Sequence, residues 1–197
     1  MYASFSFSGE WCAVKDEHLY VGGLGKEWTT PEGRVLNFNP MYVKRISPSG
    51  QVEHLNWHDA YVAMREAAGI FSPGYMIHES AAFSHRRREW TFLPRRASKS
   101  KYNDVEDERH GTNMMITADE HFRDVRMKRV GTLDEPSHGF SSFKFIPGSN
   151  DEVMVALKSE ELEGTIHSYI MVFDRKGNFL YPETKFADRK FEGIEFI

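Results

Sequence analysis

Short apolar runs alternate with clusters of glycine, proline, asparagine and aspartate along most of the chain. Runs rich in Val, Ile, Phe, Tyr and Met that are bounded by such turn-forming residues are typical of β-strands. Strand signals dominate, so we expect an all-β fold. The predicted strands are Trp11–Val14, Leu19–Val21, Tyr42–Ile46, Val52–Leu55, Ala81–Phe83, Trp90–Leu93, Asn113–Thr117, Val125–Val130, Phe143–Ile146, Val153–Leu157, Ser168–Phe173, Phe179–Tyr181 and Ile194–Ile197.

Two segments depart from the strand pattern. Asp59–Ala68 is predicted to be a helix, because Tyr61 and Met64 fall on one face at helical spacing and Gly69 is a suitable stop. The charged segment Asn103–His110 has no periodicity, and we expect a loop there.

Four segments share one form, in which an oxygen-bearing residue is followed by a strand; they open at Glu10, Glu79, Ser141 and Glu192. After the first three openings come a polar turn, a second strand and two further strands. Recurring units of four antiparallel strands are typical of propeller blades. The sequence predicts a single incomplete propeller domain over 1–197, with blades at about 10–58, 79–130 and 141–182 and a closing strand at 192–197.

The fourth unit contains only its opening strand. A propeller commonly closes by mixing strands from both ends of the chain in one blade. We therefore expect the partners of the closing strand to lie upstream of Met1, in a longer protein.

Composition narrows the class of protein. The chain has 197 residues, 40% of them hydrophobic, and its 15 Phe supply ample material for a core. No apolar run reaches the 18 or so residues that a membrane-spanning helix needs. A net charge of −4 gives no indication of nucleic-acid binding. Cys12 is the only cysteine, which excludes an internal disulfide, and residues 1–8 lack the basic flank and apolar stretch of a signal peptide.

The blade openings carry the first candidate chemistry. Because the first strand of a blade lies innermost, Glu10, Glu79, Ser141 and Glu192 are expected to converge at one end of a central channel. Carboxylates crowded together repel one another unless some protonate or a cation binds. Calcium accepts six to eight oxygen ligands with loose geometry, so the ring suits it. The alternative is that these residues only cap strands at the solvent edge.

Cationic residues form the second candidate feature. Arg95 and Arg96 follow an apolar strand end, and arginine forks match phosphate oxygens. An ordinary solvated loop is the alternative. Lys26 follows a glycine-rich stretch that lacks the spacing of a P-loop, so we expect an inter-strand loop presenting this lysine. The basic turn His85–Arg88 is expected to be solvated.

Several long strings resemble one known family, the soluble calcium-activated nucleotidases or apyrases. The resemblance extends over nearly the whole chain from Gly9 onward. It is carried by Trp11–Trp28, Ala67–Ile70, Pro73–Tyr75, Ile77–Ala81, Phe92–Ser98, His138–Pro147, Ala156–Glu161 and Phe191–Ile197.

The resemblance implies a five-bladed propeller that hydrolyses nucleoside di- and triphosphates such as UDP, GDP, ADP and ATP with a calcium ion in its central channel. It also implies a protein of the endoplasmic reticulum and Golgi, or a secreted one, and leaves a homodimer open. The alternative is a truncated, inactive propeller fragment that binds calcium or a protein partner.

Carried over by residue, the resemblance implies Glu10, Glu79, Ser141 and Glu192 as calcium ligands, which are the same four blade openings. The family supplies further ligands from an upstream Ser-Asp pair that this chain lacks. We expect Arg95, Arg96 and Lys26 to stabilise charge on the phosphoryl oxygens, with Lys158 a weaker candidate.

Overall fold

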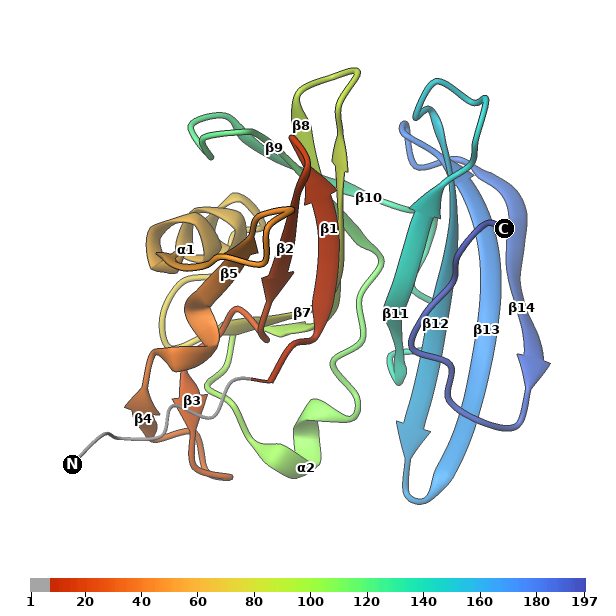
Figure 1. The fold of residues 1–197 in the computed structure, drawn as a ribbon. Helices are drawn as coiled ribbons and strands as arrows, with labels where there is room; N and C mark the ends of the chain where they lie inside the picture. The colour runs from red at the N-terminus through yellow and green to blue at the C-terminus, as the bar shows by residue number, and fades with distance from the viewer. Residues whose placement is uncertain (1–7) are drawn as a thin grey trace.

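The fold is taken from a computed structural model that describes residues 8–197. Residues 1–7, which carry most of the prediction that residues 1–8 are not a signal peptide, lie outside this range. Within the described range, three four-stranded antiparallel sheets and one two-stranded hairpin contain all the strands (Figure 1). The all-β class predicted from the sequence is confirmed.

Each of these sheets takes its strands in chain order. The first contains β1 (Trp11–Lys15), β2 (His18–Gly22), β5 (Tyr42–Ile46) and β6 (Val52–Asn56). The second contains β7 (Tyr75–Ser84), β8 (Glu89–Ser98), β9 (Met114–Asp119) and β10 (Val125–Arg129). The third contains β11 (His138–Phe145), β12 (Val153–Leu162), β13 (Thr165–Asp174) and β14 (Phe179–Ala187).

The first strands of the three sheets lie next to one another. β7 packs against both β1 and β11, so these three strands occupy the middle of the molecule (Figure 1). The hairpin of β3 (Trp28–Thr29) and β4 (Val35–Asn37) is inserted between β2 and β5. Residues at matching positions of β1, β7 and β11 are thereby brought close together.

The middle sheet is buried on both faces. Trp90 and Phe92 of β8 pack into a core shared with the first sheet and α1 (His58–Ala67), whereas Leu93 of the same strand packs into a core shared with the third sheet. Because successive side chains of a strand point to opposite faces, a strand between two cores reads as a continuous apolar run. In the first core, Trp90 meets the rings of Trp11 and Tyr20 edge-on.

Most predicted elements are confirmed, but the central strands are longer than expected. The helix is present as α1, and Gly69 after it has a φ of +71°. β7 and β8 each extend beyond the predicted apolar segments. The loop predicted at Asn103–His110 is wrong in part, since it contains the short helix α2 (Asp104–Asp107). The Asn103 side chain caps α2 by accepting hydrogen bonds from two backbone N–H groups.

The strand predicted at Ile194–Ile197 is not formed within the described residues. In the structure 192–197 is an irregular segment that runs beside β11. It is joined to that strand by a hydrogen bond from the Ile194 N–H to the Ser142 hydroxyl at 3.3 Å and by the Lys144–Glu195 ion pair at 2.6 Å. A strand needs a ladder of backbone hydrogen bonds to a neighbour, and a side-chain hydroxyl does not provide one.

Ion pairs join the sheets at the turn that was expected to be solvated. Arg88 donates to Asp16 of the first sheet, and Arg87 pairs with Glu152 of the third. The basic turn of the middle sheet thus contacts both neighbours. No helix within residues 8–197 has the length and apolar character that crossing a bilayer requires.

Candidate functional site

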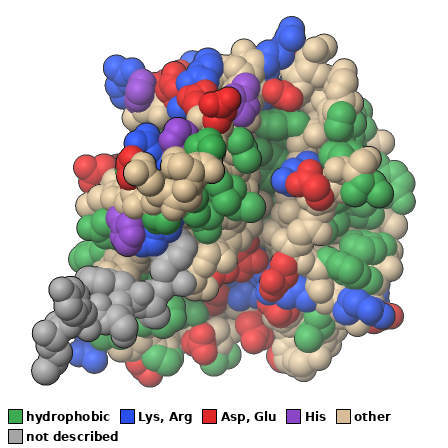
Figure 2. Space-filling view, viewed as in Figure 1, with side chains coloured by type: hydrophobic (Ala, Val, Ile, Leu, Met, Phe, Trp, Pro, Cys, Tyr) green, Lys and Arg blue, Asp and Glu red, His purple; other side chains and the backbone are tan. Residues whose placement is uncertain are grey.

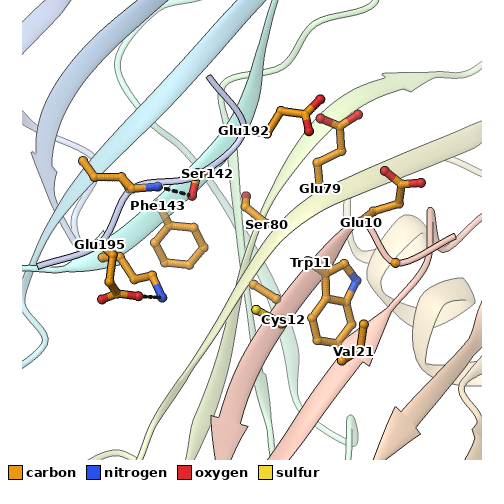
Figure 3. Close-up of a pocket in the computed structure, with 15 residues that line it drawn as sticks. Glu10, Trp11, Cys12, Val21, Glu79, Ser80, Ser142, Phe143, Glu192 and Glu195 are labelled. Carbon is orange, nitrogen blue, oxygen red and sulfur yellow. Dashed lines mark hydrogen bonds and ion pairs between the residues drawn. The ribbon is translucent and has the colours of Figure 1, made fainter. Parts of the chain in front are cut away.

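Three of the four predicted calcium ligands line one cavity. Its volume is about 520 Å³, and we call it the carboxylate cavity because Glu10, Glu79 and Glu192 all line it. Glu10 directly precedes β1, Glu79 lies in β7, and Glu192 lies in the C-terminal segment. Figure 3 shows the three carboxylates at the same end of the cavity, with Cys12 farther along it.

Two of the predicted ligands lie at β-bulges of the inner strands. The β7–β8 register shifts between His78 and Ala81, which leaves Glu79 outside the regular pairing. The β11–β12 register shifts between Phe140 and Ser142, which leaves Ser141 in the same situation. A bulge bends its strand and redirects a side chain, and bulges are frequent beside functional sites.

Ser141 is placed differently from the three glutamates. Its hydroxyl donates to the Phe191 carbonyl at 2.9 Å, and the residue is 1% exposed. Ser142, and not Ser141, is among the described residues that line the carboxylate cavity. Ser141 therefore anchors the chain immediately before Glu192, and its oxygen does not face the cavity in this structure.

Burial and neighbouring charges shift the pKa values of two carboxylates in this cavity. Burial raises the pKa of Glu79, the adjacent Arg95 opposes this shift, and the charge of Glu10 adds to it. The pKa of Glu192 is lowered by its contact with Lys190. The three carboxylates offer oxygen donors, which calcium prefers. The side chains fit that ion, but within the described residues no three His, Cys, Asp or Glu side chains converge closely enough to form a complete metal centre.

The three predicted cationic residues line a second cavity. Lys26, Arg95 and Arg96 meet there in a volume of about 400 Å³, which we call the arginine cavity. Glu79 also lines it, so this carboxylate is shared by the two cavities. Figure 2 shows acidic and basic side chains together in the hollow between the two halves of the visible face.

The three cations differ in their partners. Arg95 donates to Glu79 and to Glu161, each at 2.5 Å, and Arg96 donates to Asp107 at 2.8 Å. The Nζ atom of Lys26 is bound by neutral oxygens, the Glu27 carbonyl at 3.0 Å and the Thr29 hydroxyl at 3.1 Å. All three cationic side chains are largely buried.

Asp107 holds Arg96 through a buried network. The Asp107 carboxylate accepts from Arg96 and also from the Tyr75 hydroxyl, at 2.5 Å. The Tyr75 hydroxyl in turn contacts Nδ1 of His110 at 2.9 Å. Nε of Arg96 is buried without a hydrogen-bond partner among the described residues. Asp107 thus fixes the orientation of the Arg96 side chain, and the Nε–H of Arg96 is left available to a ligand.

Lys158, the weaker candidate, lies away from both cavities. It is 1% exposed and contacts the Asn113 side chain and Glu183. A structural role in the third sheet accounts for these contacts.

Sequence reasoning missed Glu161 and Lys190. Glu161 contacts Arg95, and Lys190 contacts both Glu161 and Glu192. Glu161 belongs to one of the strings that carry the family resemblance, so it was available as a candidate. No periodic pattern in the sequence identifies Lys190 as a site residue.

Known proteins resemble this chain over nearly its whole length. A family model described as Apyrase matches residues 3–197, beginning before the Gly9 at which the resemblance was first noted. The chain is 58% identical to soluble calcium-activated nucleotidase 1 of Rattus norvegicus and 57% identical to that of Mus musculus, over 97% of this chain and 47% of each relative. It is 48% identical to apyrase apy-1 of Caenorhabditis elegans, over 96% of this chain and 54% of the relative. The chain spans about half the length of these relatives, and it belongs to the apyrase family.

Proposed function

We propose that the protein hydrolyses nucleoside di- and triphosphates in a calcium-dependent reaction. The observation that carries the proposal is the position of Glu79, which lines both the carboxylate cavity and the arginine cavity. A cation held by carboxylates next to arginine and lysine side chains is the arrangement that phosphoryl transfer needs. The names of the relatives, which include apyrase and calcium-activated nucleotidase, point to the same chemistry.

Residues of the two cavities have distinct roles in this proposal. Glu10, Glu79 and Glu192 would hold calcium, with Ser141 contributing by fixing the chain before Glu192. When bound, calcium neutralises phosphate charge and acidifies a water molecule. Lys26 and Arg96 bind the phosphoryl oxygens from the arginine cavity, and Arg95 orients Glu79. Donors fixed in advance by burial stabilise the charge that develops in the transition state.

Aromatic side chains beside the cations support a nucleotide as substrate. Trp28 is 49% exposed and lines the arginine cavity together with Tyr102. The Lys26 ammonium lies 4.1 Å from the centre of the Tyr102 ring. Exposed aromatic faces stack readily on nucleobases. A base and its phosphates can therefore be bound side by side.

The fold proposal follows from the three sheets. Each is a four-stranded meander, and their first strands pack together around the carboxylate cavity. These features support three consecutive blades of a five-bladed propeller with the cavity on its axis. Location in the secretory pathway and a homodimer stay predictions drawn from the resemblance.

Release of phosphate from UDP, GDP and ADP, with calcium and with a chelator, tests the proposed function. Glu79→Gln removes one charge at nearly constant volume, so we expect weaker calcium binding and loss of calcium-dependent turnover. Glu53→Gln, which changes an exposed carboxylate paired with Arg45, is the matched control. Calcium affinity and turnover that are unchanged in Glu79→Gln would contradict the assignment. Calcium binding without turnover in the unsubstituted protein would favour the inactive fragment.

A further inference from the structure

Five charged side chains form an alternating chain across the site. Glu79 contacts Arg95, Arg95 contacts Glu161, and Lys190 joins Glu161 to Glu192. The N–O distances are 2.5, 2.5, 3.4 and 2.8 Å in that order. The chain begins and ends on two proposed calcium ligands. The protein's own cations therefore hold the carboxylates that calcium would need.

The formal charges of this cluster, with Glu10 included, sum to the charge that one divalent cation would neutralise. Glu10, Glu79, Glu161 and Glu192 carry four formal negative charges, and Arg95 and Lys190 supply two positive ones. The described contact of the Glu10 carboxylate is a hydrogen bond from the Ser8 hydroxyl, which brings no charge. The side chains of Arg95 and Glu79 are 3% and 16% exposed, so solvent screens their charges poorly.

We propose that Arg95 and Lys190 are built-in counter-ions that compete with calcium for Glu79 and Glu192. The inference rests on the proposed calcium site and adds how that site is regulated. A carboxylate oxygen that binds a metal is less available to a guanidinium or an ammonium group. Calcium binding therefore loosens the Glu79–Arg95 and Glu192–Lys190 pairs. Arg95 already lines the arginine cavity, so its freed donors are next to the phosphate position.

Lys190 allows the competition to be tested without disturbing the fold. Its side chain is 24% exposed, and the chain around it is anchored by other groups. The Ser168 hydroxyl donates to the Arg189 carbonyl and accepts from the Phe191 N–H, while Ser141 donates to the Phe191 carbonyl. Removal of the Lys190 charge leaves these three hydrogen bonds in place.

A different role for the same contacts predicts the opposite result. If the Lys190 ammonium orients Glu192 for metal binding, its loss weakens calcium affinity. If it competes with the metal, its loss strengthens calcium affinity. The sign of the change separates the two roles.

Calorimetric titration of the purified protein with calcium chloride alone, at low ionic strength, measures that sign. We expect Lys190→Met to bind calcium about five- to tenfold more tightly, because one unit charge near a partly buried site is removed. Lys190→Gln should act in the same direction and serves if the methionine variant is unstable. Lys144→Met is the matched control, since Lys144 lines the same cavity but pairs with Glu195 at 2.6 Å, away from the three carboxylates.

Each outcome of the titration has a definite meaning. An unchanged or weaker calcium affinity in both Lys190 variants overturns the competition. An equal gain in Lys144→Met also overturns it, because the effect would then be general electrostatics. A wild-type protein that binds no calcium removes the proposed calcium site itself.

Discussion

The Arg95 guanidinium donates to the Glu79 carboxylate at 2.5 Å, so a predicted phosphate-binding residue is paired with a predicted metal ligand. Arg95 is 2% exposed, and its second donor is held by Glu161. A buried arginine whose two terminal nitrogens are both paired with carboxylates holds those carboxylates in position. The structure therefore gives Arg95 a positioning role as well as the proposed contact with phosphate.

Arg95→Ala is expected to damage stability and activity together. Loss of one partner of a buried pair costs roughly 3–5 kcal/mol, and the partial exposure of Glu161 favours the lower end of that range. For a chain of this size, 3 kcal/mol lowers the Tm by about 6–12 °C. Calorimetry and phosphate release from UDP check both effects. An unchanged Tm would contradict the positioning role.

Gly139 has no space for a side chain beside Arg95. A Cβ atom added to it would lie 2.5 Å from the Arg95 carbonyl oxygen and 2.7 Å from Arg95 Cγ. We expect Gly139→Ala to cost about 1–3 kcal/mol, as overpacking does, and to displace Arg95. Urea unfolding and turnover measure the two consequences. Gly193→Ala, whose Cβ would meet no atom within 4 Å, should leave stability unchanged.

Residues whose environment is local were predictable from the sequence. The strand Tyr42–Ile46 has the predicted bounds, because its apolar residues and flanking turns specify it alone. The blade-opening pattern selected Glu10, Glu79 and Glu192, which line one cavity, and also Ser141, which does not. The basis for this prediction was that an oxygen-bearing residue followed by a strand recurs along the chain.

Contacts between distant segments were not predictable. Glu161 reaches Arg95 from 66 residues away, and Ser141 meets Phe191 across 50 residues. No local rule connects such pairs. The strand predicted at the C-terminus followed from Ile194 and Phe196, but a strand also depends on a neighbour that propensity does not reveal.

Glu183 is expected to make stability depend on acid pH. Burial alone would raise the pKa of this carboxyl, but its contacts with His138 and Lys158 outweigh burial and lower it. A group whose pKa is lower in the folded state stabilises the fold above its unfolded value, here 4.5, and this contribution is lost as the pH falls through the folded value.

Glu183→Gln should therefore flatten the pH dependence of unfolding below pH 4.5. At pH 7 it should cost roughly 3 kcal/mol, because Lys158 is left buried without a carboxylate partner. Urea titrations across this pH range provide the test. Parallel pH profiles for the variant and the wild type would show that Glu183 does not carry the effect.

Substitution of Lys26 is expected to differ from that of Arg95, with a loss of activity but no loss of stability. The residue is 4% exposed, and its ammonium forms no ion pair with a carboxylate of the described residues. Burial lowers its pKa, with Asp107 and Glu27 opposing the shift. A buried charge without a paired partner is costly to the fold, so its presence favours a functional role.

Lys26→Met removes that charge and keeps the apolar stem. The Tm measured without nucleotide should be unchanged or higher, because the desolvation cost of the ammonium disappears. Phosphate release from UDP should fall about a hundredfold, the usual effect of losing one donor to a developing oxyanion. Lys128→Met, at an exposed position of β10, is the control and should alter neither quantity. A lower Tm with normal turnover would show instead that Lys26 supports the loop through the Glu27 carbonyl and the Thr29 hydroxyl.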